Sequence, residues 1–251
     1  MYVRQLGAAA FVALAACGTN EALAPLEPTG PIGRVRFVNL ITDTTRGRVN
    51  AILERVPFGV NLTYAQSTPA TLPAPATAFY APVLTGDRTL VLKRTRDTSV
   101  TVATIGFTVN EGQDRTIYAI GGVGGSAVTS FVTADTNPVT AATETRLRVV
   151  QLSPTAGAVD VFVTAAGANL ATATPVATAL GYQSVSPYFT VPRGTYEIRL
   201  VRAGTAPANR AANVVLDVAS VAFAGGTDRT ILIADANEGG APIQAVVLGD
   251  R

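Results

Sequence analysis

The stretch RVRFVNL, at Arg34–Leu40, decides the fold because it returns as RLRVVQL at Arg146–Leu152, 112 positions later. A second pair of landmarks, DRTIYAI at Asp114–Ile120 and DRTILIA at Asp228–Ala234, is separated by 114 positions. Two landmarks that lie far apart and share nearly one offset predict a tandem repeat. A unit of this length exceeds a solenoid repeat, so we expect each copy to bury its own core and to fold alone.

The same stretch also indicates the secondary structure of each copy. Apolar and polar residues alternate with a period of two, which places Val35 and Phe37 on a core face and turns Arg34 and Arg36 toward water. Similar runs rich in Val, Ile and Thr follow, separated by Gly, Pro and Asp. Several short strands in about 110 residues are typical of a sandwich. The predicted class is all-β, with two tandem immunoglobulin-like antiparallel β-sandwich domains.

The domain organisation follows from changes in composition along the chain. Pro138 and a Thr/Ala-rich stretch interrupt the strand pattern between the copies, and a Pro-rich stretch precedes the first copy. We predict a signal peptide at 1–16, a lipidated tether at 17–33, a degenerate first domain at 34–138 and a second domain at 139–251.

The single cysteine, Cys17, ends an apolar run of 11 residues, LGAAAFVALAA. The run is too short to span a bilayer, but it suits the core of a secretory signal. The sequence Leu14-Ala15-Ala16-Cys17 resembles the lipobox of bacterial lipoproteins. That resemblance implies cleavage before Cys17 and anchoring of its thiol by acyl chains. Since Gly18 follows, and not the Asp that marks inner-membrane retention, it also implies the outer membrane.

Composition excludes several classes of function. Lys and Arg total 19 and Asp and Glu total 17, without charged blocks, so nothing favours nucleic acid. The chain has no His, which removes the commonest general base and metal ligand. With one Cys, it has neither a His/Cys zinc site nor an intramolecular disulfide. We expect no cofactor.

The second copy carries four motifs in a fixed order: an Arg/Val strand, then Ser-Pro, then Val-Asp-Val-Phe-Val, then two turns. They lie at Ser153–Pro154, Val159–Val163, Pro192–Tyr196 and Gly226–Asp228. Over most of residues 145–250, the chain resembles the bacterial family called domain of unknown function 4397.

The resemblance implies exported or lipid-anchored sandwich modules, often in tandem, without a known catalytic activity. The first copy is degenerate, because it lacks the Ser-Pro pair. The family often has His after its first strand, where this chain has Asn39 and Gln151, so any role of that His is absent here.

A Gly-rich segment follows a predicted strand and superficially matches a dinucleotide-binding fingerprint at Gly122, Gly124 and Ala127. That fingerprint requires a helix next, so that its N-terminus faces the pyrophosphate. A strand-like run, VTSFVTA, follows instead. We therefore expect a Gly-rich hairpin between two strands.

The segment DANEG resembles the start of a calcium loop, with Asp235, Asn237 and Glu238 as candidate metal ligands. An EF-hand needs a bidentate Glu at its twelfth position, where Val246 stands. A looser calcium site is the alternative to a solvated turn, and we expect the turn, without a bound ion.

Other polar residues have structural interpretations. We expect Asp160 and Lys93 to face outward on strands, and Asp114 and Asp228 to cap the turns before them. Four tyrosines are candidate platforms for sugar rings or, alternatively, core and corner residues. They are Tyr64, Tyr80, Tyr182 and Tyr188.

These observations predict a protein that is not an enzyme and has no catalytic residues. We expect a lipid-anchored cell-envelope protein that presents its sandwiches for binding or structural roles. Its expected partners are the membrane, through the anchor, and an envelope protein or polysaccharide. The alternative is a carbohydrate-binding or carboxylate-based glycan-acting protein. A hydrolase would bring two carboxylates together in one cleft. The ligand-binding residues stay unassigned.

Overall fold

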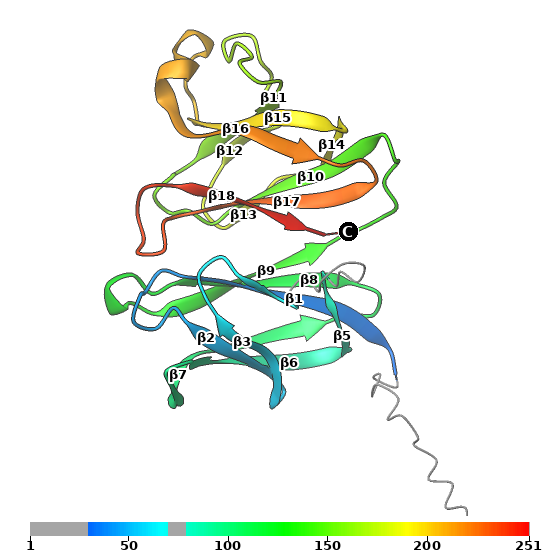
Figure 1. Cartoon of the computed structure of the whole chain (residues 1–251), viewed down its shortest axis with the longest axis vertical. Coiled ribbons are helices and arrows are strands. Elements are labelled where there is room, and N and C mark those ends of the chain that lie inside the picture. The colour runs from blue at the N-terminus through cyan, green and yellow to red at the C-terminus, as the bar shows by residue number, and fades with distance from the viewer. Residues whose placement is uncertain (1–29, 70–78, 251) are drawn as a thin grey trace, which may run out of the picture.

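The structure is a computed structural model that describes residues 30–69 and 79–250. The predicted signal peptide, Cys17 and nearly all of the tether lie outside the described residues. Each half of the chain forms nine strands in two sheets, and the halves stack along the long axis of the molecule (Figure 1). None of the helices among the described residues is long and apolar enough to cross a bilayer.

The first domain is a sandwich of two sheets. Its inner sheet has the order β4-β1-β8-β9, and β5 also pairs with β1. The inner strands are β1 (Ile32–Ile41), β4 (Ser67–Thr68), β5 (Ala81–Leu84), β8 (Asp114–Gly121) and β9 (Val128–Asp135). Its outer sheet has the order β3-β2-β6-β7. The outer strands are β2 (Val49–Leu53), β3 (Val56–Leu62), β6 (Gly86–Arg94) and β7 (Asp97–Val109).

The second domain repeats this arrangement strand for strand. Its inner sheet has the order β13-β10-β17-β18, with β14 also on β10. The inner strands are β10 (Glu144–Gln151), β13 (Ser184–Val185), β14 (Phe189–Pro192), β17 (Thr227–Ala234) and β18 (Gln244–Gly249). Its outer sheet has the order β12-β11-β15-β16. The outer strands are β11 (Val159–Thr164), β12 (Ala177–Leu180), β15 (Gly194–Arg202) and β16 (Val214–Phe223). Two 3-10 turns, η1 (Val123–Gly125) and η2 (Pro207–Asn213), complete the elements.

The predicted all-β class and the two tandem sandwich domains are confirmed. One feature departs from a purely antiparallel arrangement, because β1 pairs with β8 in parallel and β10 pairs with β17 in parallel. These parallel pairs join the two sequence landmarks of each copy, Arg34 to Asp114 in the first and Arg146 to Asp228 in the second. The landmarks recur together because they are neighbouring strands of one sheet.

Each sandwich has its own apolar core between its sheets. In the first domain Val35 and Phe37 of β1 pack against Leu90 and Leu92 of β6, all without solvent exposure. In the second, Leu147 and Val149 occupy the places of Val35 and Phe37. Alternation along the strand therefore supplies the core, as the sequence predicts.

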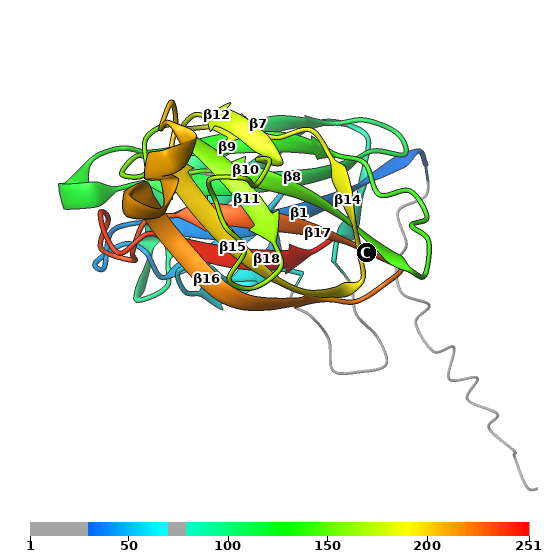
Figure 2. The ribbon, with the colours of Figure 1, turned by 90° about the horizontal axis from the view of Figure 1, so that it is seen from above.

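The opposite face of β1 is also buried, and this contradicts one expectation. Arg36 was expected to face water, yet only 2% of its surface is exposed, because the two inner sheets pack against each other. A third apolar cluster lies between them and includes Val38 and Leu40 from β1 and Val150 and Leu232 from the second domain. The molecule is thus a stack of four sheets (Figure 1). In the view from above, the strands of the two domains lie over one another (Figure 2). Arg34, at the margin of this interface, has a side chain that is 53% exposed.

Candidate functional site

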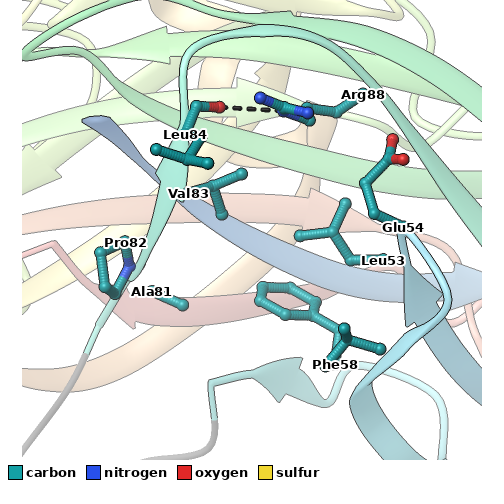
Figure 3. A pocket seen from close by; sticks show the side chains of 9 residues that line it. Leu53, Glu54, Phe58, Ala81, Pro82, Val83, Leu84 and Arg88 are labelled. Atoms are coloured by element: carbon teal, nitrogen blue, oxygen red, sulfur yellow. Dashed lines mark hydrogen bonds between the residues drawn. The ribbon is translucent and has the colours of Figure 1, made fainter. Parts of the chain in front are cut away.

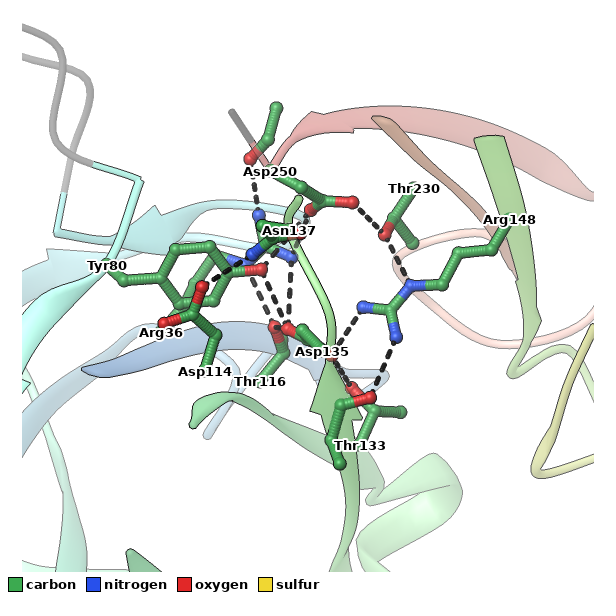
Figure 4. A network of polar contacts seen from close by, with 12 residues as sticks. Arg36, Tyr80, Asp114, Thr116, Thr133, Asp135, Asn137, Arg148, Thr230 and Asp250 are labelled. Carbon is green, nitrogen blue, oxygen red and sulfur yellow. Dashed lines mark hydrogen bonds and ion pairs between the residues drawn. The ribbon is translucent and has the colours of Figure 1, made fainter. Parts of the chain in front are cut away.

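A network of charged and hydroxyl side chains lies buried between the two domains (Figure 4). Arg36 on β1 donates from Nε to the Thr116 hydroxyl on β8 at 3.1 Å, within the first domain. Its other nitrogens reach into the second domain, where they donate to the Gly249 carbonyl at 2.6 Å and to the Asp250 carboxylate at 2.7 Å. The first domain's arginine is therefore neutralised by the second domain's carboxylate.

The second domain returns the same set of contacts. Arg148 on β10 donates from Nε to the Thr230 hydroxyl on β17 at 2.9 Å. Its remaining nitrogens donate to the Ala134 carbonyl at 3.3 Å and to the Asp135 carboxylate at 2.5 Å, both in the first domain. Each domain thus contributes an arginine and receives one, in the manner of an isologous, two-fold interface.

The two carboxylates are held by several donors each. Asp135 accepts hydrogen bonds from Thr116 at 2.5 Å, Thr133 at 2.7 Å and the Tyr80 hydroxyl at 2.7 Å. Asp250 accepts one from Thr230 at 2.6 Å. Such saturation is what keeps a charge stable away from water.

Burial and pairing act in opposite directions on the arginines. Desolvation alone would lower the pKa of Arg36, but the Asp250 carboxylate, with Tyr80, Tyr118 and Asp135, raises that pKa above its ordinary value. Asp135 raises the pKa of Arg148 against desolvation in the same way. The side chains of Arg36, Arg148 and both aspartates are 3% exposed or less. The cluster is therefore a buried ion-pair network, and Arg36, at its edge, also lines a small pocket of about 120 Å³ together with Gly249.

Two of the four candidate tyrosines are covered by arginines of this interface. The Tyr80 ring lies 4.6 Å from the guanidinium of Arg36, and the Tyr188 ring lies 3.5 Å from that of Arg146. Stacked guanidinium and aromatic planes attract each other, so these faces are not free for sugar rings. Tyr64 donates to the Asp235 carbonyl across the interface at 2.6 Å, while Tyr182 is 41% exposed.

The predicted calcium candidates do not form a set of ligands facing one cavity. The carboxylate of Asp235 is buried and accepts hydrogen bonds from Ser153, from Thr155 at 2.7 Å and from the Gly240 N–H at 3.0 Å. Asn237 and Glu238 are exposed. Within residues 30–69 and 79–250, no group of three His, Cys, Asp or Glu side chains is placed to hold a metal. Asp235 joins the β17–β18 loop to the Ser-Pro loop after β10.

The Gly-rich segment forms the expected hairpin, with β8 and β9 paired antiparallel on either side of η1. Asp114 and Asp228 do something other than cap the preceding turns. Asp114 receives a bidentate contact from Arg34 at 2.7 and 2.6 Å and one from Asn137 at 2.6 Å. Asp228 accepts a hydrogen bond from Thr140. Both aspartates therefore bind residues of the interdomain linker, which lies far from them in the sequence.

Two further residues were expected to face outward on strands. Asp160 lies on the outer side of β11, away from the core, but it is buried, with 8% of its surface exposed, and it accepts a hydrogen bond from the Ala179 N–H at 2.8 Å. Lys93 donates to the Thr101 hydroxyl at 2.7 Å on the surface of the first domain.

Two carboxylates that sequence reasoning did not single out approach each other on the second domain. Asp217 is exposed, and partial desolvation together with the neighbouring Glu197 raises its pKa above the ordinary value. Glu197 also pairs with Arg199 at 3.2 Å and accepts the Gly167 N–H at 2.9 Å. These bonds hold Glu197 against the loop that follows β11.

An apolar pocket of about 310 Å³ opens between the two sheets of the first domain (Figure 3). Ala81, Val83 and Leu84 of β5 line one side, and Leu53 and Phe58 of the β2–β3 hairpin line the other. Glu54 and Arg88 supply the charges that line it. This pocket was not predicted from the sequence. The sequence signal for it is Ala81 in β5, a small residue at the position where β14 of the second domain has Phe189.

The fold and these sites define a class of protein: tandem β-sandwich domains joined face to face. The family model described as "Domain of unknown function (DUF4397)" matches residues 33–162 and 165–251. The chain belongs to this family.

No curated protein matches the chain. Among solved structures, it is similar to a leucine-rich repeat protein from Bacteroides thetaiotaomicron, with 14% identity over 86% of this chain and a TM-score of 0.18. The match spans 26% of that protein's chain, and at this TM-score no argument rests on it.

Proposed function

We propose that the chain is a non-catalytic, lipid-anchored protein of the bacterial cell envelope, at the outer membrane, whose two sandwiches act as one rigid unit in binding. The observation that carries this proposal is the use of the buried charges. Arg36, Arg148, Asp135 and Asp250 neutralise one another across the domain interface, and their side chains are at most 3% exposed. The cavity of about 310 Å³ in the first domain is lined mainly by apolar side chains.

The same observation weighs against the glycan-hydrolysing alternative. A glycosidase needs two carboxylates about 5 Å or more apart, on either side of a bound sugar. Asp135 and Asp250 converge, but in the interior of the molecule. The apolar pocket is lined by one carboxylate, Glu54, and by neither Glu197 nor Asp217. Binding, with an envelope protein, polysaccharide or lipid as the partner, is the function that these placements favour.

The anchor is tested by Cys17→Ser, expressed in a diderm host and followed by membrane fractionation. We expect the native chain in the outer-membrane fraction. The variant lacks the thiol that would carry the acyl chains, so it should leave that fraction or keep its signal peptide. Two or more acyl chains are needed for stable anchoring, at about 0.8 kcal/mol per buried methylene.

A matched control is Ser67→Cys in the Cys17→Ser background, which restores a thiol far from the apolar run. It should not restore membrane attachment. Processing and lipidation of Cys17→Ser at the native level would refute the anchor. Hydrolysis of envelope glycans by the purified protein, abolished by Asp217→Asn, would favour the alternative.

A further inference from the structure

The apolar pocket of the first domain exists because of one position in the repeat. Val35 of β1 pairs with Ala81, and the equivalent Leu147 of β10 pairs with Phe189. Paired residues on antiparallel strands point to the same side of the sheet, so Ala81 and Phe189 are equivalent and both point inward. Phe189 packs against the second core, whereas the space beside Ala81 is open.

Two further replacements leave more open space at this end of the first domain than at the same end of the second. In the second domain, Tyr196 and Phe223 stack with ring centroids 5.9 Å apart and close the same end of the sandwich. By strand register, Arg88 and Val109 occupy their places in the first domain. Arg88 donates to the Leu84 carbonyl at 2.9 Å, as Tyr196 donates to the Pro192 carbonyl at 2.8 Å. The backbone bond is conserved between the copies while the aromatic filling is lost.

The surroundings of the pocket are apolar and open. Val56 and Leu84, which line it, are 64% and 38% exposed, and Ile32, which pairs with Leu84, is 37% exposed. Ligand pockets begin at about 300 Å³ and are lined mainly by apolar side chains with a few polar groups. At about 310 Å³ the pocket has room for one slender apolar chain and is too small for a two-chain lipid.

The charged rim restricts the head group of such a ligand. Glu54 accepts the Thr89 N–H through Oε1, and Arg88 uses Nε and Nη2 on the Leu84 and Thr85 carbonyls. Neither residue takes part in a salt bridge within the described part of the chain. One positive and one negative group therefore remain at the mouth of the pocket, and a zwitterionic head complements both.

The position of the pocket relative to the predicted anchor brings it near a membrane. Gly30, the first described residue, lies against Leu84 of the pocket wall: a Cβ placed on it would come within 3.3 Å of the Leu84 side chain. The 13 residues from Cys17 to Gly30 span at most about 45 Å when extended, at ~3.5 Å per residue. The nearness of the pocket to a membrane rests on the proposed function, whereas the pocket itself does not.

We propose that this pocket binds a single acyl chain of a zwitterionic, single-chain lipid, with the chain against Ala81 and Phe58 and the head between Arg88 and Glu54. The ligand is identified by the apolar walls, the volume and the paired charges of the rim.

The test uses the chain from Gly18 onward, which contains every described residue and needs no anchor. Dodecylphosphocholine, held below its micelle concentration, displaces a bound fluorescent naphthylamine probe, and the chain's lack of Trp removes the usual intrinsic background. We expect saturable displacement at one site per chain. Ala81→Phe inserts the ring that the second domain already accommodates, so it should weaken binding at least tenfold while the protein still melts cooperatively. Ala222→Phe, on an exposed position of β16, is the control and should bind like the native chain.

The head group is tested by comparing dodecylphosphocholine with laurate. The native chain should prefer the zwitterion, because Glu54 repels a carboxylate. Glu54→Gln keeps the acceptor for the Thr89 N–H and removes the charge, so it should shift the preference toward laurate by fivefold or more. Equal binding by native chain and Ala81→Phe would overturn the pocket, and so would dimers that bury it, detected by sedimentation. An unchanged preference in Glu54→Gln would overturn the head-group assignment. The Cys17→Ser fractionation is independent of all these outcomes, so failure of the anchor and failure of the pocket are distinguishable.

Discussion

At the scale of single residues, Asp135 shows how the interface depends on complete pairing. Its carboxylate accepts hydrogen bonds from Arg148, Thr116, Thr133 and Tyr80, and its side chain has no exposed surface. A buried ion pair contributes little net stability relative to apolar packing, but the loss of one partner leaves a charge stranded away from water. The network is therefore sensitive to any change that removes one charge.

Asp135→Asn should accordingly lower the free energy of unfolding by about 3–5 kcal/mol, the usual cost of breaking a buried pair. Urea denaturation followed by circular dichroism measures this loss. Asp97→Asn is the matched control, since Asp97 pairs with Arg94 at 3.4 Å on the surface and such pairs contribute little. Equal midpoints for Asp135→Asn and the native chain would contradict the role assigned to the network.

At the scale of elements, the two copies fasten the same pair of loops in opposite ways. In the first domain the carboxylate is on the loop after β1: Asp43 binds Arg46 at 2.5 Å, and Arg46 donates to the Gly122 and Ser126 carbonyls of the β8–β9 loop. In the second domain the carboxylate, Asp235, is on the β17–β18 loop and binds Ser153 and Thr155 after β10. Both domains therefore join the same two loops through a carboxylate, but the carboxylate lies on the first loop in one domain and on the second loop in the other.

The contact of Asp43 with Arg46 and the β8–β9 loop, which we call the Asp43 latch, should depend on pH. Desolvation opposes ionisation, but hydrogen bonds from Thr45 and Arg46 outweigh it and lower the pKa of Asp43 from 3.8 to about 2. Because the folded pKa is depressed, the stabilisation is complete above pH 4 and is lost as the pH falls toward 2. Asp43→Asn should cost about 1.5–3 kcal/mol at pH 7, the usual size for hydrogen bonds to a charged group.

The difference in unfolding free energy between native chain and Asp43→Asn, measured by denaturation from pH 7 to pH 2, isolates this group from the other carboxylates. It should shrink between pH 4 and pH 2. A difference that stays constant over this range would show that the Asp43 charge does not act in the latch.

At the scale of the whole molecule, the reciprocal interface makes one body of two domains. Each sandwich has its own core, yet each also has an inner sheet with a second buried face. The arginine and aspartate exchanged by each domain are equivalent by the repeat, so the interface has the form that two copies of one domain would make.

Separate halves, residues 30–138 and 139–251, should therefore fold with lower melting temperatures than the intact chain, because the face around Val38 and Leu40 becomes exposed. Mixing the halves should restore part of the lost melting temperature and yield a one-to-one complex in size-exclusion chromatography. A first half that carries Arg36→Met is the control and should bind its partner less well. Halves that melt like the intact chain and ignore each other would contradict the interface.

The sequence by itself determined the all-β class, the two copies and the Gly-rich hairpin, because alternation, repeat offset and turn residues are local signals. It did not determine the burial of Arg36. Alternation along the strand predicts that this arginine faces water, and only the tertiary structure shows its buried partner, Asp250. That partner lies 214 positions away. The open pocket likewise depends on which residue faces Val35 across a strand pair. Contacts between distant strands are decided by tertiary packing, which brings together residues whose local patterns carry no mark of each other.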